Sequence, residues 1–298
     1  MQFRKSVALA FAALVLASAF LPVEAKLPIW SSKLKVPYRS WIPVQKPREV
    51  LLCVHGLGFS SASYGEFGRV MASRGYAVYA IDVRGFGEWM NRREDRVNFE
   101  GCLSDIEAAL KTLRTNYPGT KIDLIGESMG GAIALAAASR NPQLVDGIIS
   151  SVPSSDRYAK MSSTLVVGAK YLTNKDKPMN IAPEVIERAT DNKALQKKME
   201  ANPTNRMQLT PKELKQFNEF MKGNYDAAAL IEKTPVLLMA GFKDKLVKPE
   251  GTIELFNSIS TTDKLLLVVG DGEHLLLEEN QLTEQLTDLV ITWLNHKQ

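Results

Sequence analysis

The sequence predicts an α/β fold, with a mostly parallel central sheet, helices on both of its faces and a helical insertion. Strand-like and helix-like segments alternate along most of the 298 residues, which is typical of parallel strands joined by helices. The first strand-like segment, REVLLCVHG, shows no polar alternation, as expected for a strand buried on both faces. The alternation stops between residues 153 and 230, where polar helical segments follow one another without a good strand.

Local patterns justify each element of the core. The helix expected over residues 101–117 has leucine and isoleucine at helical spacing and stops at Pro118-Gly119. Other helices are expected near residues 64–74, 128–140 and 250–259, with a last one that ends near Trp293. The expected strands lie in the segments REVLLCVHG, YAVYAIDV, KIDLIG, VDGIISSVP, TPVLLMAG and KLLLVVG.

The N-terminus has the layout of a cleavable secretory signal. Two basic residues, Arg4 and Lys5, precede an apolar stretch that is followed by Pro22 and the small-residue ending Val23-Glu24-Ala25. An uncleaved membrane anchor is the alternative, but the stretch is shorter than the ~20 residues that cross the hydrocarbon core. We therefore expect an exported protein, periplasmic or secreted. The expected parts are a signal peptide (1–25), a core (26–152 and 231–298) and an insertion (153–230).

Composition gives little sign of nucleic-acid or metal binding. The formal net charge is +4, which does not indicate a nucleic-acid partner, and no Cys/His spacing typical of zinc occurs. Cys53 and Cys102 are the only cysteines, and in an exported protein a disulfide between them is possible. Their places, inside a strand-like run and near the start of a helical run, favour two free and buried thiols.

Residues 126–131 read GESMGG and fit the pattern G-x-S-x-G around Ser128. The pattern alone is weak, but here an apolar strand precedes it and an alanine-rich helix follows, which is the context of a nucleophilic serine. In such a turn the serine takes a strained backbone conformation, and small neighbours let strand and helix approach each other. The competing interpretation is that Ser128 only caps the helix. The context favours the nucleophile.

A serine nucleophile needs a base, and the chain has three histidines. His274 directly follows the strand KLLLVVG, and catalytic groups gather at the carboxyl edge of open α/β sheets. His55, within HGLG, is expected to brace its loop through backbone hydrogen bonds. His296 is expected to be a solvated residue of the C-terminal tail. The candidate base is therefore His274.

The base needs an acid that orients its ring, and the reaction needs donors for the oxyanion. Asp244 lies just past the strand TPVLLMAG, again at the carboxyl edge, and we favour it over Asp271, a neighbour of His274 in the same loop. The expected oxyanion donors are the backbone N–H groups of Met129, which follows the nucleophile, and of Leu57 in the loop HGLGFSS.

With these residues the chain resembles the α/β-hydrolase family, in particular its group of monoacylglycerol lipases and lysophospholipases. The resemblance rests on YRSWIPV, LLCVHGLG, SRGYAVYAIDVRGFG, IGESMGG, GFKDKLV and GEHLLLEE, which span most of residues 38–153 and 234–279. It implies a catalytic triad of Ser128, Asp244 and His274, an oxyanion hole at Leu57 and Met129, and a lid over residues 153–230 that decides specificity. The pair Glu88-Trp89 after RGFG departs from the family's usual sequence and leaves substrate details open.

The sequence therefore predicts a serine hydrolase that cleaves a carboxylic ester through an acyl-enzyme, without metal or cofactor. We expect a monoacylglycerol- or lysophospholipid-type lipid ester as substrate. A general carboxylesterase, an aminopeptidase and an acyltransferase share the fold and remain alternatives, whereas a non-catalytic binding module should have lost part of the triad.

The composition of the insertion bears on its ligands. It holds five of the ten methionines, accompanied by Phe217 and Phe220. Methionine suits apolar ligands of varying shape, and the alternative is that these residues only fill gaps between helices. Its 13 Lys and Arg exceed its 9 Asp and Glu by four, so weak, salt-sensitive contact with an anionic membrane surface is also expected.

Overall fold

The structure is a computed structural model that describes residues 35–91, 96–158 and 164–297. The expected signal peptide, residues 1–25, lies outside the described residues. Within the three described segments, no helix combines the length and the apolar character needed to cross a membrane.

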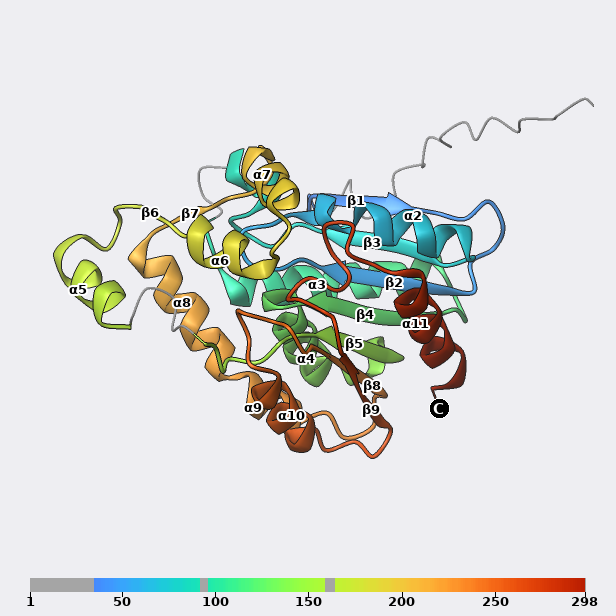
Figure 1. The fold of residues 1–298 in the computed structure, drawn as a ribbon. Coiled ribbons are helices and arrows are strands. Elements are labelled where there is room, and N and C mark those ends of the chain that lie inside the picture. The colour runs from blue at the N-terminus through green and yellow to red at the C-terminus, as the bar shows by residue number, and fades with distance from the viewer. Residues whose placement is uncertain (1–34, 92–95, 159–163, 298) are drawn as a thin grey trace, which may run out of the picture.

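A seven-stranded sheet forms the centre of the fold (Figure 1). Its strands are β1 (Tyr38–Trp41), β2 (Glu49–Val54), β3 (Ala77–Ile81), β4 (Lys121–Glu127), β5 (Gly147–Ser151), β8 (Val236–Gly241) and β9 (Lys264–Val269). The order across the sheet is β1-β3-β2-β4-β5-β8-β9, and all neighbours are parallel except β1 and β3. These pairings confirm the predicted mostly parallel sheet. Strands β2, β3, β5 and β8 are buried along nearly their whole length.

Strand β1 was not expected from the apolar pattern, and the structure corrects this. Its four residues pair antiparallel with β3 at the edge of the sheet, where Tyr38 lies opposite Ile81. Its residues are only partly buried or exposed, so no continuous apolar run marks it in the sequence.

Helices cover both faces of the sheet, as predicted. On one face lie α2 (Gly65–Ser73) and α11 (Glu284–His296), whose side chains such as Phe67 and Val290 share one apolar cluster with strand residues. On the other face lie α3 (Phe99–Asn116), α4 (Met129–Arg140) and α10 (Pro249–Ser258). Short 3-10 helices are η1 (Ser61–Tyr64), η2 (Gly87–Asn91) and η3 (Pro142–Leu144).

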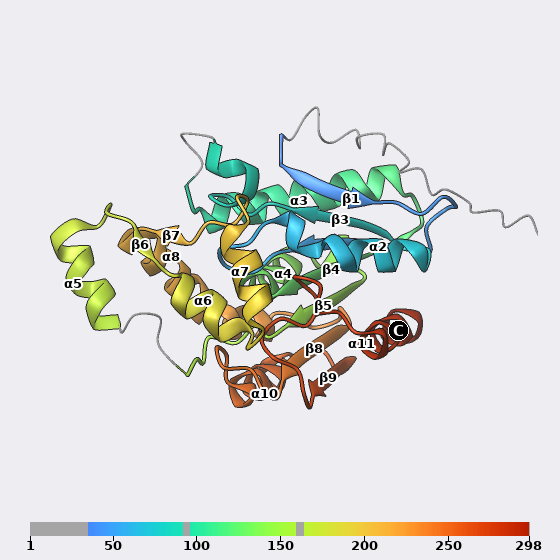
Figure 2. The ribbon, with the colours of Figure 1, turned by 45° about the horizontal axis from the view of Figure 1, so that its top comes forward.

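The chain between β5 and β8 carries the insertion. Its elements are α5 (Thr164–Asn174), β6 (Met179–Asn180), α6 (Ala182–Ala189), α7 (Lys193–Ala201), β7 (Gln208–Leu209), α8 (Pro211–Lys222) and α9 (Asn224–Ala229). Helix α7 is separate from α6 and has its own N-cap. The Asn192 side chain accepts the backbone N–H groups of Ala194 and Leu195. The insertion was expected to lack strands, but β6 and β7 form a two-residue antiparallel pair. Figures 1 and 2 show α5 to α8 together at one end of the sheet.

Both cysteines are free and buried, as the sequence favours. Burial raises the pKa of the Cys102 thiol to about 12, so this thiol stays protonated and behaves as a small apolar side chain.

Candidate active site

Ser128 lies in the turn between β4 and α4, in a strained backbone conformation with φ 55° and ψ −117°. Its side chain makes no capping hydrogen bond to α4, which argues against the interpretation as a helix cap. The turn needs glycine on both sides of it. A Cβ on Gly126 would lie 2.1 Å from the Gly130 carbonyl oxygen, and one on Gly130 would lie 1.9 Å from the Val54 oxygen. The surroundings therefore hold the serine in its strained conformation.

Asp244 and His274 meet at the carboxyl edge of the sheet. Nδ1 of His274 lies 2.7 Å from Oδ2 of Asp244, and both side chains are buried. The other oxygen of Asp244 accepts the backbone N–H groups of Leu246 and Val247 at 2.7 and 2.9 Å. The carboxylate is therefore fixed by its own loop, and its contact at Nδ1 leaves Nε2 as the free ring nitrogen of the histidine. Asp271, the sequence alternative, is exposed in the preceding turn.

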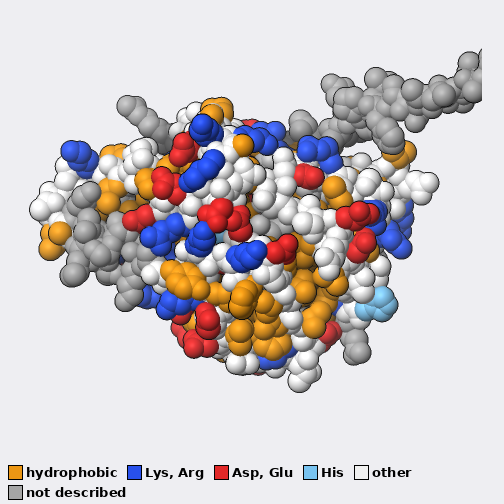
Figure 3. All heavy atoms as spheres, viewed as in Figure 1, with side chains coloured by type: hydrophobic (Ala, Val, Ile, Leu, Met, Phe, Trp, Pro, Cys, Tyr) orange, Lys and Arg blue, Asp and Glu red, His pale blue; other side chains and the backbone are white. Residues whose placement is uncertain are grey.

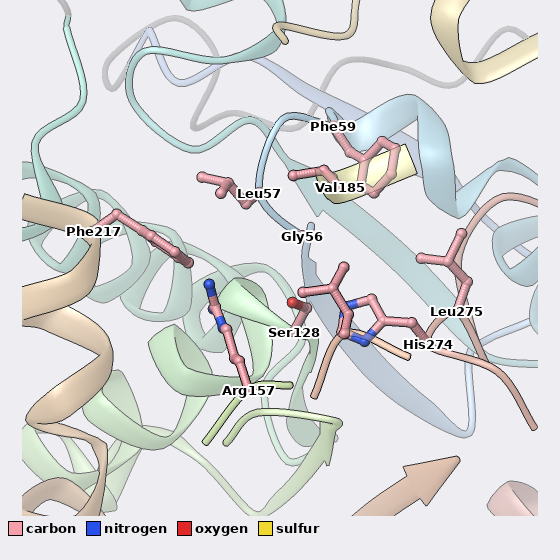
Figure 4. A pocket seen from close by; sticks show the side chains of 10 residues that line it. Gly56, Leu57, Phe59, Ser128, Arg157, Val185, Phe217, His274 and Leu275 are labelled. Atoms are coloured by element: carbon pink, nitrogen blue, oxygen red, sulfur yellow. The ribbon is translucent and has the colours of Figure 1, made fainter. Parts of the chain in front are cut away.

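Ser128 and His274 line one small cavity of about 10 Å³, which has room for about one water molecule (Figure 4). The insertion contributes Val185 from α6 and Phe217 from α8 to its wall. The full lining consists of Gly56, Leu57, Phe59, Ser128, Arg157, Val185, Phe217, Leu246, His274 and Leu275.

The two expected oxyanion donors border this serine. Leu57 lines the cavity, and Met129 follows Ser128 as the first residue of α4, where the backbone N–H groups of a helix lack partners within the helix. His55 braces the loop before Leu57, as expected. Its Nδ1 donates to the Gly56 carbonyl at 2.8 Å and its Nε2 accepts the Val83 N–H at 2.9 Å. Burial lowers the pKa of His55, which agrees with a neutral ring in these two roles.

His296 lies away from these residues. It is exposed in the last turn of α11, where its ring bonds to the Thr292 carbonyl oxygen, so it belongs to a helix and not to a loose tail.

Two buried glutamates, which were not predicted from the sequence, hold together the loops that carry the candidate triad. Glu127, immediately before the serine, accepts the Ser151 hydroxyl and the backbone N–H groups of residues 276–278, which follow His274. Glu278 accepts the N–H of Gly56 at 2.8 Å and contacts the Ser63 hydroxyl at 2.6 Å. One carboxyl thus fixes the histidine loop to the serine turn, and the other fixes it to the loop of Leu57. The sequence contained a signal for these two buried carboxyl groups, because both glutamates directly follow apolar runs.

The insertion is bonded to the same loops. The N–H of His274 donates to the Ala189 carbonyl at 3.3 Å, and the N–H of Asp191 donates to Oε1 of Glu273 at 2.8 Å. At the other loop, the N–H of Arg206 donates to the Gly58 carbonyl at 2.7 Å. The insertion therefore forms part of the cavity wall and is hydrogen-bonded to both the histidine loop and the loop of Leu57.

The positions of Arg157, Val185 and Phe217 beside Ser128 were not predicted, although Phe217 was expected to take part in an apolar surface of the insertion. All three belong to the insertion, and no local pattern marks their place beside Ser128. Among the described residues, no group of three or more His, Cys, Asp or Glu is arranged to hold a metal ion.

Comparison with known proteins agrees with this architecture. A family model described as serine aminopeptidase, S33, matches residues 45–281. Monoglyceride lipase of Mus musculus is 27% identical over 268 residues, which cover 87% of this chain and 86% of that protein. Monoacylglycerol lipase of Mycolicibacterium smegmatis is 24% identical over 266 residues, with 87% and 92% covered.

Solved structures share the fold. The Paleococcus ferrophilus monoacylglycerol lipase superposes with a TM-score of 0.72 at 21% identity, covering 88% of this chain and 99% of that one. A soluble variant of Saccharomyces cerevisiae monoglyceride lipase, in complex with a substrate analog, gives 0.74 at 19% identity, with 88% and 92% covered. Because the family match spans most of the chain, the protein is a hydrolase of the α/β-hydrolase type and belongs to the family described as serine aminopeptidase, S33.

Proposed function

We propose that the protein is a serine hydrolase that cleaves single-chain lipid esters of the monoacylglycerol or lysophospholipid type. The observation that carries the proposal is the 2.7 Å contact between Asp244 and His274 beside a serine held in a strained turn. The names of the relatives support the lipid ester, since several are monoglyceride or monoacylglycerol lipases.

Acylation uses the serine and the histidine. Oγ of Ser128 attacks the ester carbonyl carbon while Nε2 of His274 accepts its proton, and Asp244 stabilises the imidazolium that forms. The backbone N–H groups of Leu57 and Met129 stabilise the oxyanion. When the tetrahedral intermediate collapses, His274 gives the proton to the leaving alcohol.

Deacylation repeats these steps with water. His274 accepts a proton from a water molecule, which attacks the acyl carbon, and the carboxylic acid leaves as Ser128 regains its proton. An acyltransferase would admit an alcohol instead of water at this step.

The charges in the cavity argue against aminopeptidase activity, although the matching family is described as serine aminopeptidase, S33. An enzyme that acts at a free N-terminus needs negative groups to hold the substrate ammonium. Within the described chain no Asp or Glu lines the cavity, and Arg157 adds a positive charge there. We therefore favour esters.

The insertion serves as a lid in this proposal. An acyl chain cannot enter a cavity of about 10 Å³, so α6 and α8, which carry Val185 and Phe217, have to move apart for substrate to reach Ser128. The net positive charge of the insertion would favour weak contact with anionic lipid. Figure 3 shows basic and acidic side chains mixed on this face, which keeps such attraction modest. We further propose that residues 1–25 direct export and are removed.

A covalent probe and a substrate panel test the proposal. A fluorophosphonate should label the wild type and not the Ser128→Ala variant, and labelling of that variant would overturn the assignment. His274→Ala should lower turnover by several powers of ten, whereas His296→Ala should change it little. The panel comprises p-nitrophenyl esters, monoacylglycerols, lysophospholipids and aminoacyl amides. A rate that peaks at acyl chains of two to four carbons would indicate a general carboxylesterase instead.

A further inference from the structure

Arg157 brings a cationic side chain to the wall of the catalytic cavity. It lines the cavity together with Ser128 and His274. Figure 4 shows its side chain beside Ser128, on the side of the serine opposite the imidazole of His274. Its guanidinium carbon lies 4.6 Å from the centre of the Phe217 ring, so an aromatic face flanks the charge. A group attached to an ester at Ser128 would come close to this guanidinium.

The backbone of Arg157 is fixed to the loop of the candidate triad acid. Arg157 forms an antiparallel β-bridge with Val247, and the N–H of Tyr158 donates to the Leu246 carbonyl at 3.3 Å. The N–H groups of the same two loop residues donate to Asp244. The position of the arginine is therefore set by the element that orients His274, and not by the helices of the insertion alone.

The charge of Arg157 is partly withdrawn from water. Its Nε is shielded from solvent, and the other lining residues of the cavity are apolar, glycine, serine or histidine. Burial lowers the pKa of the Arg157 guanidinium to about 10, against the opposing effect of the Asp244 charge, so the group stays cationic at neutral pH. A cation in such a site attracts an anion more strongly than it would in water.

We propose that Arg157 binds an anionic group, a phosphate or a carboxylate, that the substrate carries next to its scissile ester. The inference rests on the proposed function and narrows its substrate class to anionic single-chain esters. The planar guanidinium presents paired N–H donors that match two oxygens of such a group. A neutral glycerol head group offers no charge to this side chain and gains much less from it.

Three esters with one acyl chain and different head groups test the proposal. The head groups are glycerol, glycerol phosphate and a short carboxylate, and each ester is used at concentrations at which it is monomeric. Wild type should have a higher kcat/KM for the two anionic esters. Arg157→Gln should lower kcat/KM for them by about tenfold or more, with a much smaller effect on the neutral ester, and Arg157→Lys should restore part of the preference. The difference between the two anionic esters shows whether phosphate or carboxylate fits better.

Arg188→Gln provides the matched control. It removes the same charge from α6 but does not line the cavity, so it reports on general attraction of anions. The inference is overturned by an equal loss on all three esters in Arg157→Gln, by a wild-type preference for the neutral ester, or by an equal effect of Arg188→Gln. A loss of packing against Phe217 would lower all three rates together and would leave their ratio unchanged.

Protection of Ser128 from the fluorophosphonate separates this inference from the proposed function. A single-chain alkyl phosphate should slow labelling of the wild type at concentrations about tenfold or more below those required with Arg157→Gln. If wild type cleaves none of the esters but shows this protection, the lipid-ester function fails and the anion site stands. If it cleaves the esters but protection does not depend on Arg157, the anion site fails alone.

Discussion

Replacing Glu278 by glutamine tests whether this buried carboxyl keeps its proton in the folded protein. The hydroxyl of Ser63 has one proton, yet its oxygen lies 2.6 Å from Oε2 of Glu278 and 2.8 Å from the Ser60 carbonyl oxygen. A protonated Glu278 accounts for both contacts, because its carboxyl O–H donates to the Ser63 oxygen and the Ser63 O–H donates to the Ser60 carbonyl oxygen. Glu127 accepts several N–H groups and suits the ionised form. Burial, followed by the negative charge of Glu127, holds the pKa of Glu278 well above its usual range.

The sign of the pH dependence follows from this raised pKa. Above the ordinary glutamate pKa of about 4.3 the unfolded chain releases a proton that the folded protein retains. The free energy of unfolding of wild type therefore falls as pH rises from the unfolded pKa towards the folded one, by up to ~1.4 kcal/mol per pH unit from this group. The glutamine lacks this dependence but keeps both hydrogen bonds, with its NH₂ donating to Ser63 and its oxygen accepting from Gly56.

Urea unfolding at several pH values measures the difference. Relative to wild type, Glu278→Gln should gain up to ~2 kcal/mol between about pH 5 and pH 6.5 while ester turnover stays near the wild-type rate. Glu278→Ala should lose about 1–3 kcal/mol at all these pH values, because the Gly56 N–H loses its buried acceptor. Parallel curves for wild type and Glu278→Gln, or equal destabilisation by glutamine and alanine, would refute a protonated Glu278.

Further changes probe the serine turn and its partners. Asp244→Asn should lower kcat by about four powers of ten and Asp271→Asn should change it little, as measured with any cleaved ester; the reverse ranking would transfer the role of the acid. Glu127→Gln should destabilise the fold by about 3 kcal/mol in urea unfolding, since its NH₂ would face backbone N–H groups; an unchanged midpoint would contradict those bonds. Gly130→Ala should cost about 3 kcal/mol or more in the same assay because its Cβ meets a backbone oxygen, whereas Gly168→Ala, in open space on α5, should stabilise by up to ~1 kcal/mol.

The parts of the fold that the sequence predicts are those that depend on neighbours along the chain. The buried strands show as apolar runs, and Ser128 shows because its tight turn requires glycine at fixed positions. The closeness of Asp244 and His274 could be predicted because each lies in a loop that follows a strand, and strand ends meet at one edge of a parallel sheet.

The residues that were not predicted from the sequence owe their positions to contacts between segments that lie far apart along the chain. The place of Arg157 and Phe217 beside the serine results from packing of the insertion against the core, which no spacing in the sequence reports. Strand β1 is short and lies at an edge, so its side chains show neither a buried run nor a clear alternation. Glu127 has its partners in the loop after His274, far along the chain.

If the insertion opens as proposed, its hydrogen bonds to Gly58 and His274 oppose substrate entry while they keep the reacting groups in place. In the proposed mechanism the helices of the insertion move to admit an acyl chain, and this movement pulls on the two loops that carry the proposed base and a proposed oxyanion donor. Weaker hydrogen bonds between the insertion and these loops would speed binding of the ester but leave the reacting groups less well aligned. Stronger hydrogen bonds would improve the alignment and slow binding. Turnover is then fastest at an intermediate strength of these bonds, so variants selected for faster uptake of bulky esters should lose rate in the acylation step.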